Sequence, residues 1–322
     1  MPLLYPRLDR TQWFAVFTCI ATYTLILIGG IVRITDSGLG CPDWPLCHGN
    51  LIPPAEKAVL IEFSHRTAAT IVGGMVVVLG LLVWRRYRAP LVRRLMLAAF
   101  PLLLFQAGLG GVTVKRELPA SIVAFHHGTA MLFLALLVII TSIMIMTDRG
   151  RPGSPFHALA HASYPRWVLG TALALLALMV SGSYTAASHA GLAFPDWPLF
   201  AGRLLPDGGR LQDIHFLHRV TAAAVGVIIL VLAGYTRGSQ PRGSVLQSLA
   251  GTAVAIYAVQ VVVGAGNIWT GLNQGVAAAH LALGALLWIT MIVLFMMALY
   301  DAEPEAASSA RRAPARSATH GA

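Results

Sequence analysis

Charged side chains are scarce in this sequence. Asp, Glu, Lys and Arg make up 11% of its 322 residues, whereas soluble globular domains carry about 25%. So few charged residues cannot cover the surface of soluble domains. A chain of this length is therefore not a pair of soluble domains. The net charge of +10 does not indicate a nucleic-acid partner, because excess Lys and Arg in a membrane protein mark its cytoplasmic loops.

Long apolar stretches are abundant instead, with 57% hydrophobic residues and a mean hydropathy of +0.71. Eight of them are long enough to cross a hydrocarbon layer of about 30 Å as helices. The first runs on through Gly29, Gly30 and Arg33 without a small-residue cleavage site, so it is not a signal peptide. We expect an all-α polytopic membrane protein with eight transmembrane helices. The stretches cover residues 13–34, 61–84, 95–114, 121–146, 167–187, 213–235, 247–270 and 277–300.

Lys and Arg are distributed unevenly between these stretches. The N-terminal segment, every second loop and the tail hold fifteen of them, and the alternate loops hold five. Because Lys and Arg collect on the cytoplasmic side, this predicts that both termini are cytoplasmic. The tail at 301–322 is rich in Ala, Ser, Arg and Pro, which predicts a disordered cytoplasmic extension.

The sequence repeats itself at an offset of 153 residues. One repeated segment is GLGCPDWPLC at 38–47, which returns as GLAFPDWPLF at 191–200; a second is EFSHR at 62–66, which returns as HFLHR at 215–219. Since each half contains four spans, an even number, the halves are expected to be parallel repeats related by an axis along the membrane normal. We therefore expect two four-helix bundles, at 1–150 and 151–300.

Four histidines occupy equivalent positions in the two halves, near the outer ends of the expected helices. They are His65, His126, His218 and His280. One histidine in a membrane helix is more often a packing residue, but the repetition favours a shared role. Two imidazoles at one depth on neighbouring helices can hold a haem iron from both sides. Zinc would need a third or fourth ligand at short spacing, so one haem in each half is the better interpretation.

Two arginines directly follow histidines of this set. Arg66 and Arg219 could provide positive charge for haem propionates, which would point toward the same outer surface. They could equally be side chains that reach for the membrane interface.

These residues together resemble the haem A synthase family, membrane oxygenases that convert haem O to haem A for cytochrome oxidase. The resemblance covers about residues 13–300, and its most specific parts are TDSGLGCPDWPLCHG at 35–49, EFSHR at 62–66 and IHFLHR at 214–219. It implies that His218 and His280 hold haem B, and that His65 and His126 bind the haem being oxidised. One departure is His127, where a hydrophobic residue is usual.

The resemblance also implies the reaction and its setting. The C8 methyl group of haem O would be oxidised to a formyl group by dioxygen-derived chemistry with external electrons. A bacterial-type plasma membrane would be the location, and a haem O synthase would supply the substrate. The electron donor and the oligomeric state, including a homo-oligomer, stay open.

The N-terminal half carries groups that its twin lacks. Glu62 lies one helical turn before His65 and is replaced by His215 in the other half. A carboxylate beside a haem can relay protons or stabilise positive charge, so Glu62 is the expected catalytic residue. Its alternative role is to neutralise an arginine or orient a ligand.

All three cysteines lie in this half, and two of them are in its long outer loop. Cys41 and Cys47 flank PDWPL on the oxidising side of the membrane, and phenylalanines replace both in the second half. This location favours a disulfide, either structural or redox-active.

Two other functions fit the histidine pattern. A cytochrome b-type electron carrier between a quinol and an acceptor would hold two haems B. A haem transporter would ligate haem only transiently. The differences between the halves favour the oxygenase, because they indicate that one site does different work from the other.

Overall fold

A computed structural model describes residues 7–50, 53–151 and 154–302, and nine α-helices account for most of that part of the chain. Eight of the nine are long and apolar enough to cross a membrane, which confirms the prediction of eight transmembrane helices. All but the first two residues of the predicted tail at 301–322 lie outside the described residues. The helices are α1 (Arg10–Ile34), α2 (Lys57–Arg86), α3 (Pro90–Lys115), α4 (Ala120–Asp148), α5 (Ala158–His161), α6 (Ser163–Ala187), α7 (Arg210–Ser239), α8 (Val245–Trp269) and α9 (Gln274–Asp301).

The spans have the lengths that a bilayer requires. The shortest has 25 residues, which at a rise of about 1.5 Å per residue exceeds a hydrocarbon core of about 30 Å. Local signals set several of their starts: Asp9 and Gln12 form a capping box at α1, and the Asn273 side chain accepts from two backbone N–H groups at α9. The structure adds the one-turn helix α5, which the hydropathy pattern did not predict because it is too short to span a membrane.

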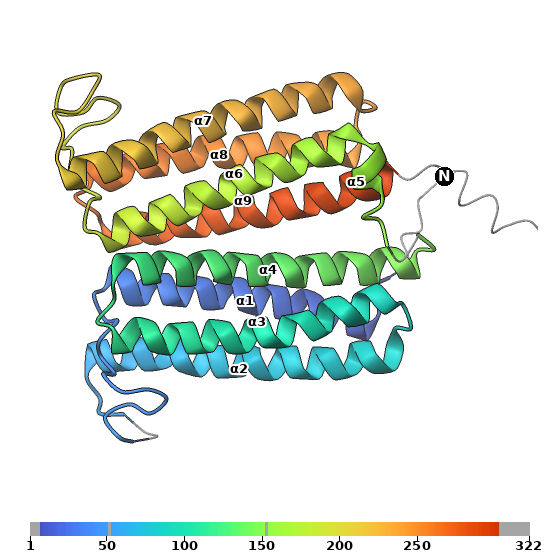
Figure 1. The fold of residues 1–322 in the computed structure, drawn as a ribbon, viewed down its shortest axis with the longest axis horizontal. Coiled ribbons are helices and arrows are strands. Elements are labelled where there is room, and N and C mark those ends of the chain that lie inside the picture. The colour runs from blue at the N-terminus through green and yellow to red at the C-terminus, as the bar shows by residue number, and fades with distance from the viewer. Residues whose placement is uncertain (1–6, 51–52, 152–153, 303–322) are drawn as a thin grey trace, which may run out of the picture.

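The helices form two groups of four that lie side by side, α1 to α4 and α6 to α9 (Figure 1). Helices α4 and α9 lie at the junction, where each packs against helices of both groups. Accordingly, 61% of the span in α4 and in α9 is buried, against 17–33% in the other six spans. The most extensively buried helices of the protein are thus those between the two groups. There the Trp288 indole donates a hydrogen bond to the Met131 carbonyl over 2.8 Å.

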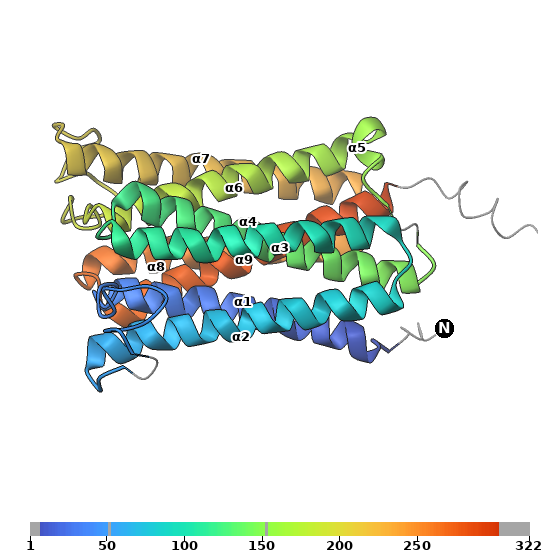
Figure 2. The ribbon, with the colours of Figure 1, turned by 60° about the horizontal axis from the view of Figure 1, so that its bottom comes forward.

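Both long loops, α1–α2 and α6–α7, lie at the same end of the molecule (Figures 1 and 2). The start of α1 and the end of α9 lie at the opposite end. Equivalent loops of the two halves lie at the same end because an even number of spans, four, separates them. The cytoplasmic position of the termini stays a prediction from the Lys and Arg distribution, as does the division of labour between the halves.

Candidate functional site

The two repeated loops are built around an aspartate. Asp43 accepts hydrogen bonds from the backbone N–H groups of Gly49 (2.7 Å) and His48 (2.6 Å), and a cis peptide joins Trp44 to Pro45. Asp196 accepts equivalent bonds in the second loop. The Gly49 N–H, and then the His48 N–H, hold the pKa of the Asp43 carboxyl below its ordinary value. The carboxylate therefore stays ionised at neutral pH and keeps the loop folded back on itself.

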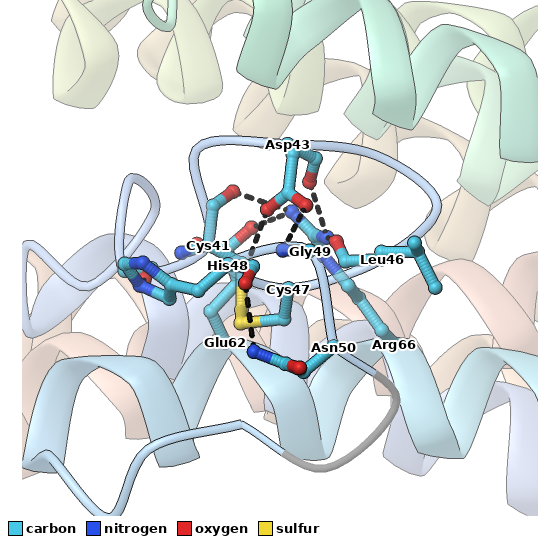
Figure 3. The surroundings of a disulfide bond; sticks show 10 residues. Cys41, Asp43, Leu46, Cys47, His48, Gly49, Asn50, Glu62 and Arg66 are labelled. Atoms are coloured by element: carbon cyan, nitrogen blue, oxygen red, sulfur yellow. Dashed lines mark hydrogen bonds and ion pairs between the residues drawn. A yellow bond between two sulfur atoms is a disulfide. The ribbon is translucent and has the colours of Figure 1, made fainter.

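Arg66 joins helix α2 to the first loop (Figure 3). Its Nη1 donates to the carbonyls of Asp43 (2.6 Å) and Leu46 (2.7 Å), and its Nη2 donates to the Cys41 carbonyl (2.7 Å) and the Glu62 carboxylate (2.5 Å). These four bonds use all four terminal N–H groups of the guanidinium. Only Nε–H is left for the haem propionate that the sequence suggested as a partner of Arg66. In the structure this arginine holds the loop against α2, and its contact with a haem propionate stays a prediction.

Glu62 has both carboxylate oxygens engaged. One accepts from Arg66, and the other accepts from the Cys41 backbone N–H over 2.8 Å. The side chain is 4% exposed, and a buried carboxylate is tolerated because the arginine and the N–H compensate its charge. The structure therefore places Glu62 in the neutralising arrangement that the sequence offered as its alternative role. The same contacts fix the carboxylate one turn from His65.

The structure contains the disulfide between Cys41 and Cys47, with the Cα atoms 4.7 Å apart. Both cysteines are buried with Val59 and Phe63 of α2. Because the Cys41 N–H is bonded to Glu62, the disulfide loop and the carboxylate are mechanically joined. The third cysteine, Cys19, lies within α1 and contacts the Thr141 hydroxyl, as expected of a packing residue.

We expect the disulfide to be present in protein isolated without reductant. The non-reduced peptide that contains Cys41 and Cys47 should be two hydrogens lighter by mass spectrometry than its reduced form. Cys19 is the internal control, because it has no cysteine partner in the described structure and should react with an alkylating reagent after denaturation. Three alkylatable thiols in that protein would contradict the assignment.

The second half replaces the acid and the disulfide with aromatic rings. Phe194 and Phe200 stand at the cysteine positions with their centroids 5.0 Å apart, and the Arg219 guanidinium lies over both rings. Arg219 donates to His215 Nε2 (3.1 Å) and to the loop carbonyls of Leu199 (2.8 Å) and Asp196 (3.0 Å). The loop is held as in the first half, but with no carboxylate at its base.

Each of the four histidines lies against a glycine of the neighbouring helix. The Cβ of an alanine at Gly29, Gly110, Gly182 or Gly264 would lie 2.8–3.2 Å from the Cε1 atom of the facing ring. The facing rings are those of His65, His126, His218 and His280, in that order. The sequence analysis overlooked these glycines, although they recur at the repeat offset. They explain why His126, and not His127, occupies the repeated position, since Gly110 faces the His126 ring.

The Nδ1 atoms of His65, His126 and His280 are buried without a hydrogen-bond partner. A helix-held glutamine fixes the backbone behind the second histidine in both halves: Gln106 donates to the His126 carbonyl and Gln260 to the His280 carbonyl, each over 2.9 Å. His65 and His218 lie in the third turn of their helices, because α2 and α7 begin earlier than predicted.

These residues fit a haem in each half. Glycine gives a ring room to stand edge-on against the next helix, and imidazoles whose nitrogens lack protein partners can ligate a metal. Among the described residues, no cluster of three or more His, Cys, Asp or Glu could hold a bare metal ion. A histidine pair in an apolar bundle suits a macrocycle that supplies the other iron ligands itself. The site defines the chain as a multi-pass membrane protein with paired histidines in two bundles.

The chain belongs to the COX15-CtaA family, described as cytochrome oxidase assembly proteins, whose profile matches residues 12–60 and 55–292. Three bacterial relatives, each named "Heme A synthase", are similar over most of their length. The protein of Halalkalibacterium halodurans is 28% identical over 88% of this chain and 95% of its own, and that of Alkalihalophilus pseudofirmus is 29% identical over 88% and 97%. The protein of Symbiobacterium thermophilum is 31% identical over 74% and 79%. With its eight apolar helices, the chain is a multi-pass protein of the plasma membrane.

Proposed function

We propose that this protein is a haem A synthase, an oxidoreductase that converts the C8 methyl group of haem O to a formyl group. The observation that carries the proposal is the unequal pair of histidine sites. Both halves present two glycine-backed imidazoles, but only the first has a carboxylate and a disulfide joined at the base of its loop. The names of the relatives support the same activity.

The C-terminal half is the proposed site of a resident haem B. His218 on α7 and His280 on α9 would provide the two axial ligands, and the bound haem supplies one-electron redox chemistry. The protein's contribution would be a ring orientation set by Gly182 and Gly264, and a loop that Arg219 holds against α7. In this half His215 replaces the carboxylate that lies one turn before the ligand in the first half, which suits electron transfer without the making of bonds.

The N-terminal half is the proposed substrate site. His65 and His126 would bind haem O, and Glu62 would act on the oxidation of its methyl group. A carboxylate at this place can accept a proton or stabilise positive charge that develops on the substrate carbon. Arg66 and the Cys41 N–H hold that carboxylate in position. A haem O synthase would supply the substrate, and dioxygen with an external electron donor would supply the oxidising chemistry.

The direct test is to extract haem from bacteria that express this chain together with a haem O synthase, and to separate the haems by chromatography. We expect haem A to form, and to be absent from cells that carry the haem O synthase alone. The purified protein should contain haem B together with haem O or haem A. A cytochrome b-type electron carrier would instead contain two haems B and make no haem A, and that outcome would overturn the proposal.

A further inference from the structure

One of the four imidazoles differs from the others at Nδ1. The His218 Nδ1 lies 3.0 Å from the Ser181 hydroxyl oxygen, whereas the Nδ1 atoms of His65, His126 and His280 are buried without a partner. Ser181 belongs to α6 and directly precedes Gly182, the glycine that faces the His218 ring. The serine therefore places a hydroxyl beside this ring, next to the glycine against which the ring lies.

The hydrogen bonds of Ser181 define the protonation of the ring. The hydroxyl has one hydrogen, and it is donated to the Leu178 carbonyl over 2.8 Å. With that hydrogen on Leu178, the oxygen can only accept from His218, and this arrangement places the proton on the imidazole Nδ1. This leaves Nε2 with its lone pair, and Nε2 is then the atom available to a metal. For His218, the contact with Ser181 favours the tautomer that ligation through Nε2 needs.

The equivalent position in the first half cannot make this bond. At the repeat offset, Ser181 corresponds to Ile28, which directly precedes Gly29, the glycine that faces His65. An isoleucine side chain neither donates nor accepts, and His65 Nδ1 is left without a partner. The two halves thus share the ring and the glycine but differ in the group behind the ring.

We propose that Ser181 is a positioning residue that makes His218 a permanent haem ligand, and that Ile28 leaves His65 a ligand from which haem can be released. This rests on the proposed function, in which the first site must bind haem O and discharge haem A while the second keeps its haem. A hydrogen bond from Nδ1–H to the serine increases the basicity of the imidazole, strengthens the iron–nitrogen bond and stabilises the oxidised iron. Removing the bond weakens the ligand and favours the reduced iron.

The test is a set of three variants in purified protein that retains its haems. Ser181→Ala should raise the midpoint potential of the b-type haem in a spectroscopic redox titration. It should also speed the transfer of haem B to excess apomyoglobin about tenfold, the lower end of the usual effect of losing such a partner. Ser181→Thr, which keeps the hydroxyl, should resemble the wild type. Ile28→Ser should slow the transfer of haem O or haem A from the first site by a similar factor.

The readouts separate this inference from the proposed function. Wild-type potential and haem-loss rate in Ser181→Ala would overturn the role of the serine, and an unchanged loss of haem O in Ile28→Ser would overturn that of the isoleucine. If Ser181→Ala retains no haem B, recovery of that haem in Ser181→Thr supports the proposal and its absence there overturns it. Haem B in the second site without haem A formation would reject the synthase and leave the role of Ser181 standing.

Discussion

Cells that carry Glu62→Gln are expected to accumulate haem O and to form little haem A. The substitution keeps the shape of the side chain but removes its negative charge and its capacity to accept a proton. If the carboxylate acts on the oxidation of the methyl group, its loss should lower the rate on the order of a hundredfold or more. Haem B should remain, because its proposed ligands lie in the other group of helices. Chromatography of extracted haems measures haem O and haem A, and the reduced spectrum of the membranes measures haem B.

The structure dictates the controls for this experiment, because Glu62 also holds the loop through Arg66 and the Cys41 N–H. Glu62→Asp keeps the charge and should retain more activity than Glu62→Gln. His215→Gln changes the equivalent position of the second half, where the side chain also contacts the loop-holding arginine, and should leave haem A formation largely intact. Wild-type amounts of haem A in Glu62→Gln, at normal protein abundance, would reduce the carboxylate to a structural role.

His218→Ala and His280→Ala are each expected to remove the low-spin haem B or convert it to a high-spin form. Each substitution deletes one of the two proposed axial ligands, and an alanine side chain cannot ligate iron. Haem A formation should fall with it, because the second site is the proposed electron route to the first. The reduced optical spectrum of purified protein shows the loss directly, and a haemochrome assay gives the amount.

The matched control for these variants is His65→Ala, the same change at the equivalent position of the first half. It should retain the haem B spectrum and lose the bound substrate haem. His127→Ala is a second control, since its neighbour His126 is the one that faces Gly110; it should keep both haems. An unchanged b-type spectrum in both His218→Ala and His280→Ala would reject the assignment of the second site.

Part of the candidate site could be predicted from the sequence because the chain repeats. The four histidines stood out by their offset, and so did the replacement of Glu62 by His215 and of two cysteines by phenylalanines. The arginines show the limit of this reasoning. For Arg66 and Arg219 the sequence suggested propionates or the interface, and it did not predict that both donate to loop carbonyls about twenty residues earlier in the chain. No periodicity reports which way a long side chain turns.

The sequence by itself determined the eight spans and showed that the two halves are repeats of each other. Membrane helices follow from the hydropathy of contiguous residues, because each backbone group bonds within its own helix and needs no distant partner. Only the tertiary structure decided which groups meet across helices. The bond of the Cys41 N–H to Glu62 and that of Ser181 to His218 join residues at least 21 positions apart. The glycine that faces each imidazole lies on a different helix from the histidine. Such contacts depend on how the helices pack, and local sequence does not encode that.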